Sequence, residues 1–225
     1  MIAILSPRVV VALPVVLAVA LLAGCGSFLS GGAKGSAADY YMLHHLPLPT
    51  GQERPGGASA PQVVMILEPS LPGALATDGI AVRIGAYRIA YLTGARWSDE
   101  TPLLLARLIR QAVDSLPHVV AISEDEVGIV PQWRLVSELD TFFAEAADST
   151  SPPERVHVEL TARLLAARPG NLFAERHFSA EARIAGSGND AIVGAFDNAT
   201  NQVITALRSW LAQELSTAES AQPAG

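Results

Sequence analysis

The chain contains one cysteine, Cys25, which directly follows the small residues of the run Leu22-Ala23-Gly24. A thiol here can be converted to a thioether that carries diacylglycerol, and the α-amine that cleavage before Cys25 frees can be acylated as well. Several acyl chains in one bilayer anchor a protein durably, since each buried methylene contributes about 0.8 kcal/mol and a single chain binds only marginally. The chemistry available to Cys25 is therefore membrane anchoring.

The residues before Cys25 have the layout of an export signal. One basic residue, Arg8, precedes the apolar residues 9–22, and Pro14 interrupts that run. A helix that spans a bilayer needs about 18 or more apolar residues, so a transmembrane anchor is the weaker interpretation. Because the small residues and the cysteine match the bacterial lipobox pattern, we expect cleavage before Cys25 and lipid attachment to it.

The residues around Cys25 also bear on stability and location. With a single cysteine, the chain can form no internal disulfide even in an oxidising compartment, so its stability must come from packing. Gly26 and Ser27 follow the cysteine, whereas lipoproteins kept in the inner membrane commonly carry Asp at the first of these positions. We therefore expect an anchor in the outer membrane, on the side that faces the periplasm.

Two histidines are candidates for metal binding. His157 and Glu159 lie two residues apart in a strand-like segment, so they share one face, and His177 with Glu175 on a neighbouring strand could join them. No second histidine lies close to either one in the sequence. We therefore predict no metal site and interpret these residues as the wet face of a sheet.

Other short motifs have structural interpretations. Gly186-Ser187-Gly188 lacks the G-x-S-x-G spacing of a serine nucleophile and is expected to be a connector. Asn198-Ala199-Thr200 matches a glycosylation acceptor only formally, because it lies inside a predicted helix. The acidic run Glu124-Asp125-Glu126 is expected to be a solvated loop, and it could also steer a basic partner surface. The sequence thus predicts no catalytic residues and no cofactor.

Length and charge limit the remaining possibilities. The chain has 225 residues, and removal of residues 1–24 leaves 201, enough for one domain that buries roughly 70% of its unfolded surface. The formal charge of −7 becomes about −8 once Arg8 is removed. Such a charge argues against nucleic acid and against an anionic lipid surface as electrostatic partners.

The residues that follow Cys25 divide into strand-like and helix-like segments. Apolar residues alternate with polar ones in the strand-like segments, with a hairpin turn expected near Gly85; these segments are 39–46, 62–68, 79–92, 133–143, 156–164 and 171–184. In residues 133–143 we place Thr141 and Phe143 on the same face as Trp133. The last two segments are expected to pair antiparallel across a turn at residues 168–171.

Two segments have the period of an amphipathic helix. One runs from Leu105 to Leu116, with Ser98 expected to cap its start and Asp99 and Glu100 near the positive end of its dipole. The other runs along residues 192–211. Strands, helix, strands and helix in this order predict a mixed α/β layered domain with a largely antiparallel second half.

In the type and order of its residues, the chain resembles the ABC-type transport auxiliary lipoproteins. These are third components of Mce-type and paraquat-inducible-type lipid transport systems. The resemblance rests on three patterns of residue type and order: Tyr40-Tyr41-Met42-Leu43; Ile80-Ala81-Val82-Arg83 continuing through Tyr91 to Ala95-Arg96-Trp97-Ser98-Asp99; and the C-terminal Ser209-Trp210-Leu211. It implies a compact α/β/α-type domain with a mixed sheet and a role that is not enzymatic. We interpret Trp97 as a core residue.

The resemblance also implies partners. They would be an Mce-domain protein that crosses the periplasm and, through it, an inner-membrane permease and an ATPase, with self-association left open. The chain lacks the phosphate-binding pattern G-x-x-x-x-G-K-[ST], so ATP chemistry must reside in another subunit.

Two other functions remain as alternatives, an anchored periplasmic hydrolase and a solitary ligand-binding lipoprotein. The expected organisation is a lipoprotein signal peptide, a lipidated cysteine with a flexible Gly/Ser/Ala tether, the α/β auxiliary domain and a disordered tail, at residues 1–24, 25–38, 39–215 and 216–225. Residues 49–61 and 146–153 are expected to be low-order stretches of the domain.

Overall fold

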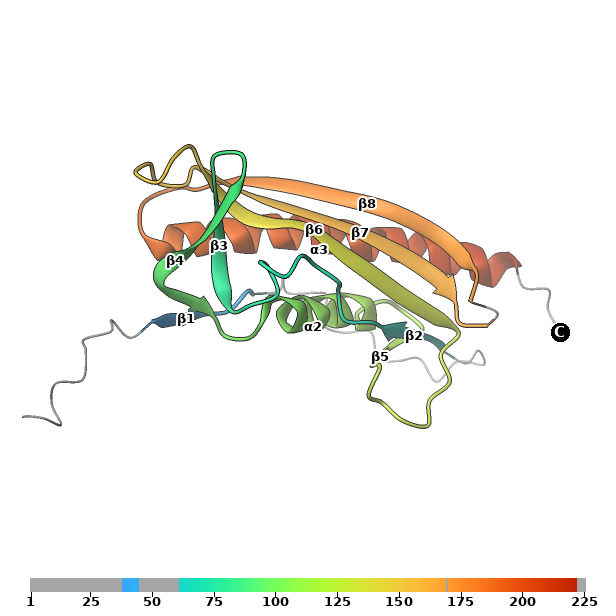
Figure 1. Cartoon of the computed structure of the whole chain (residues 1–225). Helices are drawn as coiled ribbons and strands as arrows, with labels where there is room; N and C mark the ends of the chain where they lie inside the picture. Colours follow the sequence, from blue (N-terminus) through green and yellow to red (C-terminus); the bar gives the residue numbers. More distant parts are fainter. Residues whose placement is uncertain (1–37, 45–60, 169, 222–225) are drawn as a thin grey trace, which may run out of the picture. The chain divides into compact units, whose positions relative to one another are not determined.

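The sheet is organised around one long strand, β6 (Trp133–Ala146). The computed structural model describes residues 38–44, 61–168 and 170–221, all of which lie in one compact unit that begins at Ala38. Along one edge β6 pairs antiparallel with β7 (Arg155–Ala166), and β7 pairs antiparallel with β8 (Leu172–Arg183), as Figure 1 shows. The antiparallel pairing predicted for the second half of the chain is confirmed.

The other edge of β6 is shared by two strands. Its first residues pair in parallel with β2 (Gln62–Ile66), and its last residues pair in parallel with β3 (Gly79–Ile84). An isolated bridge between Ser70 and Glu138 lies between these two pairings. The sheet therefore forks at β6.

Each branch of the fork carries further strands. β5 (Val119–Ser123) pairs in parallel with β2. On the other branch, β4 (Arg88–Trp97) forms a hairpin with β3, and β1 (Asp39–Tyr41) pairs in parallel with β4. The hairpin turns at Gly85, whose φ of 60° suits glycine, and this turn was predicted from the sequence.

Two helices complete the domain. α2 (Thr101–Asp114) packs against β2 and β5, whereas α3 (Asn189–Ala221) packs against β6, β7 and β8. The helices also contact each other, and the Nε of Arg208 donates to the Oγ of Ser115 at 2.8 Å. The mixed α/β domain with two main amphipathic helices is thus confirmed.

Aromatic side chains from three elements meet in the core. Trp97, from the end of β4, is 1% exposed, and its ring centroid lies 5.3 Å from that of Phe196 on α3 and 5.9 Å from that of Phe142 on β6. The Phe142 and Phe196 centroids are 4.9 Å apart. Such aromatic contacts add to the burial of apolar area. Trp97 is a core residue, as predicted.

The alternation along β6 changes face halfway. The pairing with β7 shifts its register between Leu139 and Thr141, so the residues after the irregularity point the opposite way from those before it. Phe142 is 1% exposed in the core, whereas Phe143 lies on the other face, 4.5 Å below the guanidinium of Arg83. The placement of Thr141 and Phe143 on the same face as Trp133 was therefore wrong.

The start of α2 also differs from the prediction. Its N-cap residue is Glu100, and no side chain supplies a capping hydrogen bond. Ser98 lies too far from the first turn to act as a cap, and its N–H instead donates to the carbonyl of Tyr41 at 2.8 Å. Thr101 ties the helix start to the preceding loop, because its hydroxyl donates to the carbonyl of Thr77 at 2.9 Å. The prediction that Ser98 caps this helix was wrong.

Several boundaries differ as well. β5 was not predicted, and among the described residues 39–44 only β1 is a strand. α3 continues to Ala221, past the point at which a disordered tail was predicted, since Ala218 extends the apolar stripe and is 6% exposed. Ala206, which was assigned to that stripe, is exposed.

Truncation of Phe142 should test the change of face in β6. We expect Phe142→Ala to lower the free energy of unfolding by about 3–5 kcal/mol, because it empties a packed aromatic site. Phe143→Ala is the matched control and should cost about 1 kcal/mol, as is usual for a partly exposed position. Urea denaturation measures both, and equal losses would contradict this assignment of faces.

Candidate functional site

The predicted lipidation site lies outside the part of the chain that the structure describes, which begins at Ala38. The expected tether and the expected low-order residues 49–61 fall wholly or almost wholly outside it too. What the structure does describe is the segment that follows the tether.

Residues 39–44, which follow the expected tether, are attached to α3 by hydrogen bonds. The Tyr41 hydroxyl donates to Oδ1 of Asp190 at 2.7 Å, and the His44 N–H donates to Oδ1 of Asp197 at 2.6 Å. Nδ2 of Asn201 donates to the His44 carbonyl at 2.9 Å. The hydrogen bond to Asp190 raises the pKa of Tyr41 above its ordinary value. The described residues at the start of the domain are thus tied to the N-terminal half of α3.

The histidines considered as metal ligands lie apart. His157 lies opposite Glu181, and His177 lies opposite Thr161, four residues away along the same pair of strands. Nε2 of His157 lies 2.9 Å from a Glu145 oxygen, and its Nδ1 lies 3.2 Å from a Glu181 oxygen. Among the described residues, no group of three or more His, Cys, Asp or Glu is arranged to hold a metal ion.

The acidic partner of His157 has a perturbed pKa. The Arg83 guanidinium donates to Glu145, and this hydrogen bond, followed by the one from His157, lowers the pKa of the Glu145 carboxyl. These ion pairs link β3, β6, β7 and β8 on one face of the sheet. Because these ion pairs join neighbouring strands, we interpret them as cross-strand contacts that stabilise the sheet.

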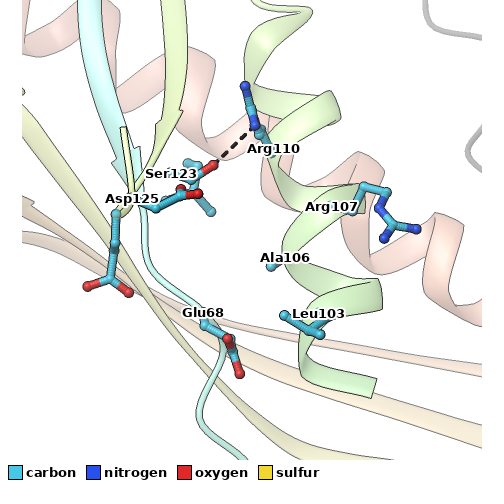
Figure 2. A pocket seen from close by; sticks show the side chains of 9 residues that line it. Glu68, Leu103, Ala106, Arg107, Arg110, Ser123 and Asp125 are labelled. Carbon is cyan, nitrogen blue, oxygen red and sulfur yellow. Dashed lines mark hydrogen bonds between the residues drawn. The ribbon is translucent and has the colours of Figure 1, made fainter. Parts of the chain in front are cut away.

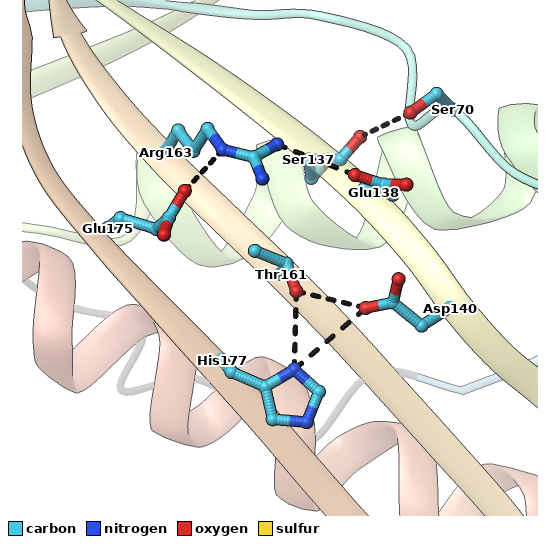
Figure 3. Close-up of polar contacts among 8 residues, drawn as sticks. All are labelled: Ser70, Ser137, Glu138, Asp140, Thr161, Arg163, Glu175 and His177. Atoms are coloured by element: carbon cyan, nitrogen blue, oxygen red, sulfur yellow. Dashed lines mark hydrogen bonds and ion pairs between the residues drawn. The ribbon is translucent and has the colours of Figure 1, made fainter.

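Figure 3 shows a similar network further along this face. Arg163 donates to Glu175 and also lies 3.5 Å from Glu138. The Thr161 hydroxyl donates to Asp140 at 2.9 Å, and Nδ1 of His177 lies 3.2 Å from that hydroxyl. These contacts span neighbouring strands, and their side chains are partly exposed to solvent.

The motifs around Ser187 and Asn198 lie in the elements that were predicted for them. Ser187 sits between Gly186 and Gly188, which have φ values of 118° and 83°, in the connection that leads into α3. Asn198-Ala199-Thr200 is part of α3, and Thr200 is 2% exposed. The expectation that these motifs are structural agrees with both positions.

An open groove of about 400 Å³ lies between α2 and the carboxyl ends of β2 and β5 (Figure 2). Its lining combines apolar and charged side chains from three separate parts of the sequence. They are Ile66, Glu68, Leu103, Ala106, Arg107, Arg110, Ser123, Glu124 and Asp125.

The two arginines of the groove are engaged within the domain. Arg110 donates to the Ser123 hydroxyl at 3.1 Å and pairs with Glu126 at 3.1 Å. Arg107 pairs with Asp99 at 3.0 Å, and Figure 2 shows its guanidinium turned away from Ser123.

The carboxylates that line the groove differ from its arginines in their ion pairing. Glu68, Glu124 and Asp125 form no ion pair with any described residue. The groove therefore presents unpaired negative charge next to the apolar side chains of Ile66 and Leu103.

Exposed apolar residues follow the acidic run on the β5–β6 connection. Val127 is 96% exposed, Val130 is 66% exposed and Ile129 is 44% exposed. Acidic and apolar contact surfaces thus lie next to each other along the chain. The acidic run Glu124-Asp125-Glu126 was the one signal in the sequence for this groove.

The family of the chain follows from comparison with known proteins. Residues 44–207 match the family model described as ABC-type transport auxiliary lipoprotein component. This match covers most of the domain, and the chain belongs to this family. It is therefore a lipoprotein-family component that accompanies an ABC-type transport system, and the predicted family is confirmed.

Solved structures share the fold. A protein from Xanthomonas campestris is 20% identical with a TM-score of 0.69, and the match covers 82% of this chain and all of the other. An uncharacterized protein is 16% identical with a TM-score of 0.58, and the match covers 80% of this chain and 99% of the other. No curated protein matches the chain.

Within residues 38–44, 61–168 and 170–221, neither helix combines the length and the apolar character that crossing a bilayer needs.

Proposed function

We propose that this protein is a lipid-anchored subunit on the periplasmic side of the outer membrane, and that it acts by docking to an Mce-type lipid transport system. The match of residues 44–207 to the transport auxiliary family carries the proposal. The sequence around Cys25 supplies the anchor, because a cysteine after small residues and an export signal can receive lipid.

In this proposal the chain contributes binding and no catalysis. Its sequence lacks a phosphate-binding loop, so a separate ATPase supplies the energy through the inner-membrane permease. The direct partner is the Mce-domain protein that crosses the periplasm. Anchored partners in one envelope meet at a high effective concentration, so a modest intrinsic affinity is sufficient.

The acidic groove between α2 and β5 is the proposed contact surface for that partner. The unpaired Glu68, Glu124 and Asp125 attract a basic segment, and the nearby apolar side chains of Leu103 and Val127 can pack against it. Negative charge at a groove raises the rate of encounter with a basic surface and makes it sensitive to salt.

Removal of the lipid acceptor tests the anchor. We expect Cys25→Ala to remain unprocessed or to leave the outer-membrane fraction, because no thioether can form. Cell fractionation with fatty-acid labelling measures this, and Ser27→Ala is the control that keeps the cysteine. A Cys25→Ala protein that still carries label in the outer membrane would contradict the lipoprotein assignment.

Charge reversal in the groove tests the docking surface. We expect Glu124→Lys with Asp125→Lys to weaken binding of the detergent-extracted full chain to the Mce-domain protein by about tenfold, which is about 1.4 kcal/mol. The reason is that both changes convert attraction of a basic segment into repulsion.

Glu154→Lys is the matched control, since Glu154 is an exposed carboxylate in the β6–β7 turn and should leave affinity unchanged. An equal loss in the control would exclude the groove as the contact. Absence of binding by the unaltered chain would exclude the Mce partner itself.

A further inference from the structure

Among the described residues, the forked sheet has three edge strands, and two of them are protected. On β5 the Ala121 N–H lies 3.4 Å from a carboxylate oxygen of Asp114, and the Ser123 N–H donates to Glu126 at 3.0 Å. β1 has only three residues, and the chain after it is held by α3. Short edges and occupied N–H groups prevent pairing with another strand.

The third edge, β8, is long and open. It has 12 residues and contains no proline. The Ile184 N–H donates to the Glu154 carbonyl across the β7–β8 pair at 3.0 Å, so even-numbered residues pair with β7 and odd-numbered residues direct their backbone groups outward. No hydrogen bond joins these outward groups to another described residue.

We propose that β8 pairs antiparallel with β8 of a second copy of this chain, about a two-fold axis at Ser179. Odd-numbered residues would then face each other as hydrogen-bonded pairs, since these are the residues whose backbone groups point outward. The inference is independent of the proposed transport role, because it rests on the strand edge alone.

The charges of β8 select this register. With the axis at Ser179, Glu175 lies opposite Arg183 of the second copy, and His177 lies opposite Glu181. An axis at His177 would place two histidines face to face, and an axis at Glu181 would place two glutamates face to face. Either axis would pair Glu175 and Arg183 with an uncharged residue or with none. Opposite charges directly across an antiparallel pair are stabilising.

The charge pattern continues onto β7. Glu175 already accepts from Arg163, and Glu181 already lies 3.2 Å from His157. Pairing would therefore set each of these carboxylates between a basic residue of its own copy and a basic residue of the second copy. On the inner face, Phe178 would lie opposite Ala180, so a large side chain meets a small one.

The helix layer permits the same arrangement. Strands lie about 4.8 Å apart, so two α3 helices that each lie beneath β7 and β8 come within about 10 Å of each other, which is a helix packing distance. From Gly194 to Gln213 every exposed residue of α3 is uncharged. Within this stretch, fully exposed like charges therefore do not oppose the approach.

Cysteine cross-linking of the full chain in its membrane tests the axis. Hydrogen-bonded opposite residues have Cα atoms about 5.5 Å apart, which is within the range that a disulfide spans. Ser179→Cys should therefore form a disulfide-linked dimer under mild oxidation, and reductant should reverse it.

Two controls distinguish specific pairing of the β8 strands from random collision of exposed cysteines. Ser187 is also exposed but lies beyond the end of β8, so Ser187→Cys should give no dimer. The unaltered chain reports any linkage through Cys25. Monomer in Ser179→Cys, or equal dimer in Ser187→Cys, would overturn the proposal.

Charge exchange tests the register. In the Ser179→Cys chain, Arg183→Glu should lower the cross-linked fraction severalfold, because it places two carboxylates opposite each other. Adding Glu175→Arg exchanges the pair and should restore the dimer. Cross-linking that neither change affects would overturn the register. None of these outcomes alters the affinity for the Mce-domain protein, so the proposed function is tested separately.

Discussion

Strand β6 holds the fold together because both of its edges are used, one by β7 and the other by β2 and β3 in turn. A strand of 14 residues is long enough to serve two neighbours on one edge. The register shift after Leu139 turns Phe142 toward α3, where it meets Trp97 and Phe196. Without that shift Phe142 would point to the other face of the sheet, away from Trp97 and Phe196.

Three limbs extend from β6, and each has a different surface. The limb of β3, β4 and β1 receives the chain that follows the tether and joins it to α3 through Tyr41 and His44. The limb of β2 and β5 forms the acidic groove with α2, and the limb of β7 and β8 ends in an open strand edge. The proposed anchoring, docking and self-association would therefore use different residues.

Local patterns in the sequence predicted the elements well, and long-range pairing was not accessible from them. The alternation in 156–164 and the period in 192–211 depend on neighbours in sequence, and both gave the correct element type. The face of Phe143 depends on a register shift against β7, and the start of α2 depends on Thr101 contacting Thr77. The prediction for Cys25 also rests on contiguous residues, whereas the groove joins Glu68, Leu103 and Asp125 from three separate segments.

The proposed role places this chain in the same pathway as an Mce-type transporter, and comparison of gene deletions tests this role most directly. Outer-membrane permeability is measured in strains that lack this chain, the permease, or both. If the chain is a docking subunit, each single deletion weakens the barrier similarly and the double deletion adds nothing. Additive defects in the double deletion would mean separate pathways and would contradict the account.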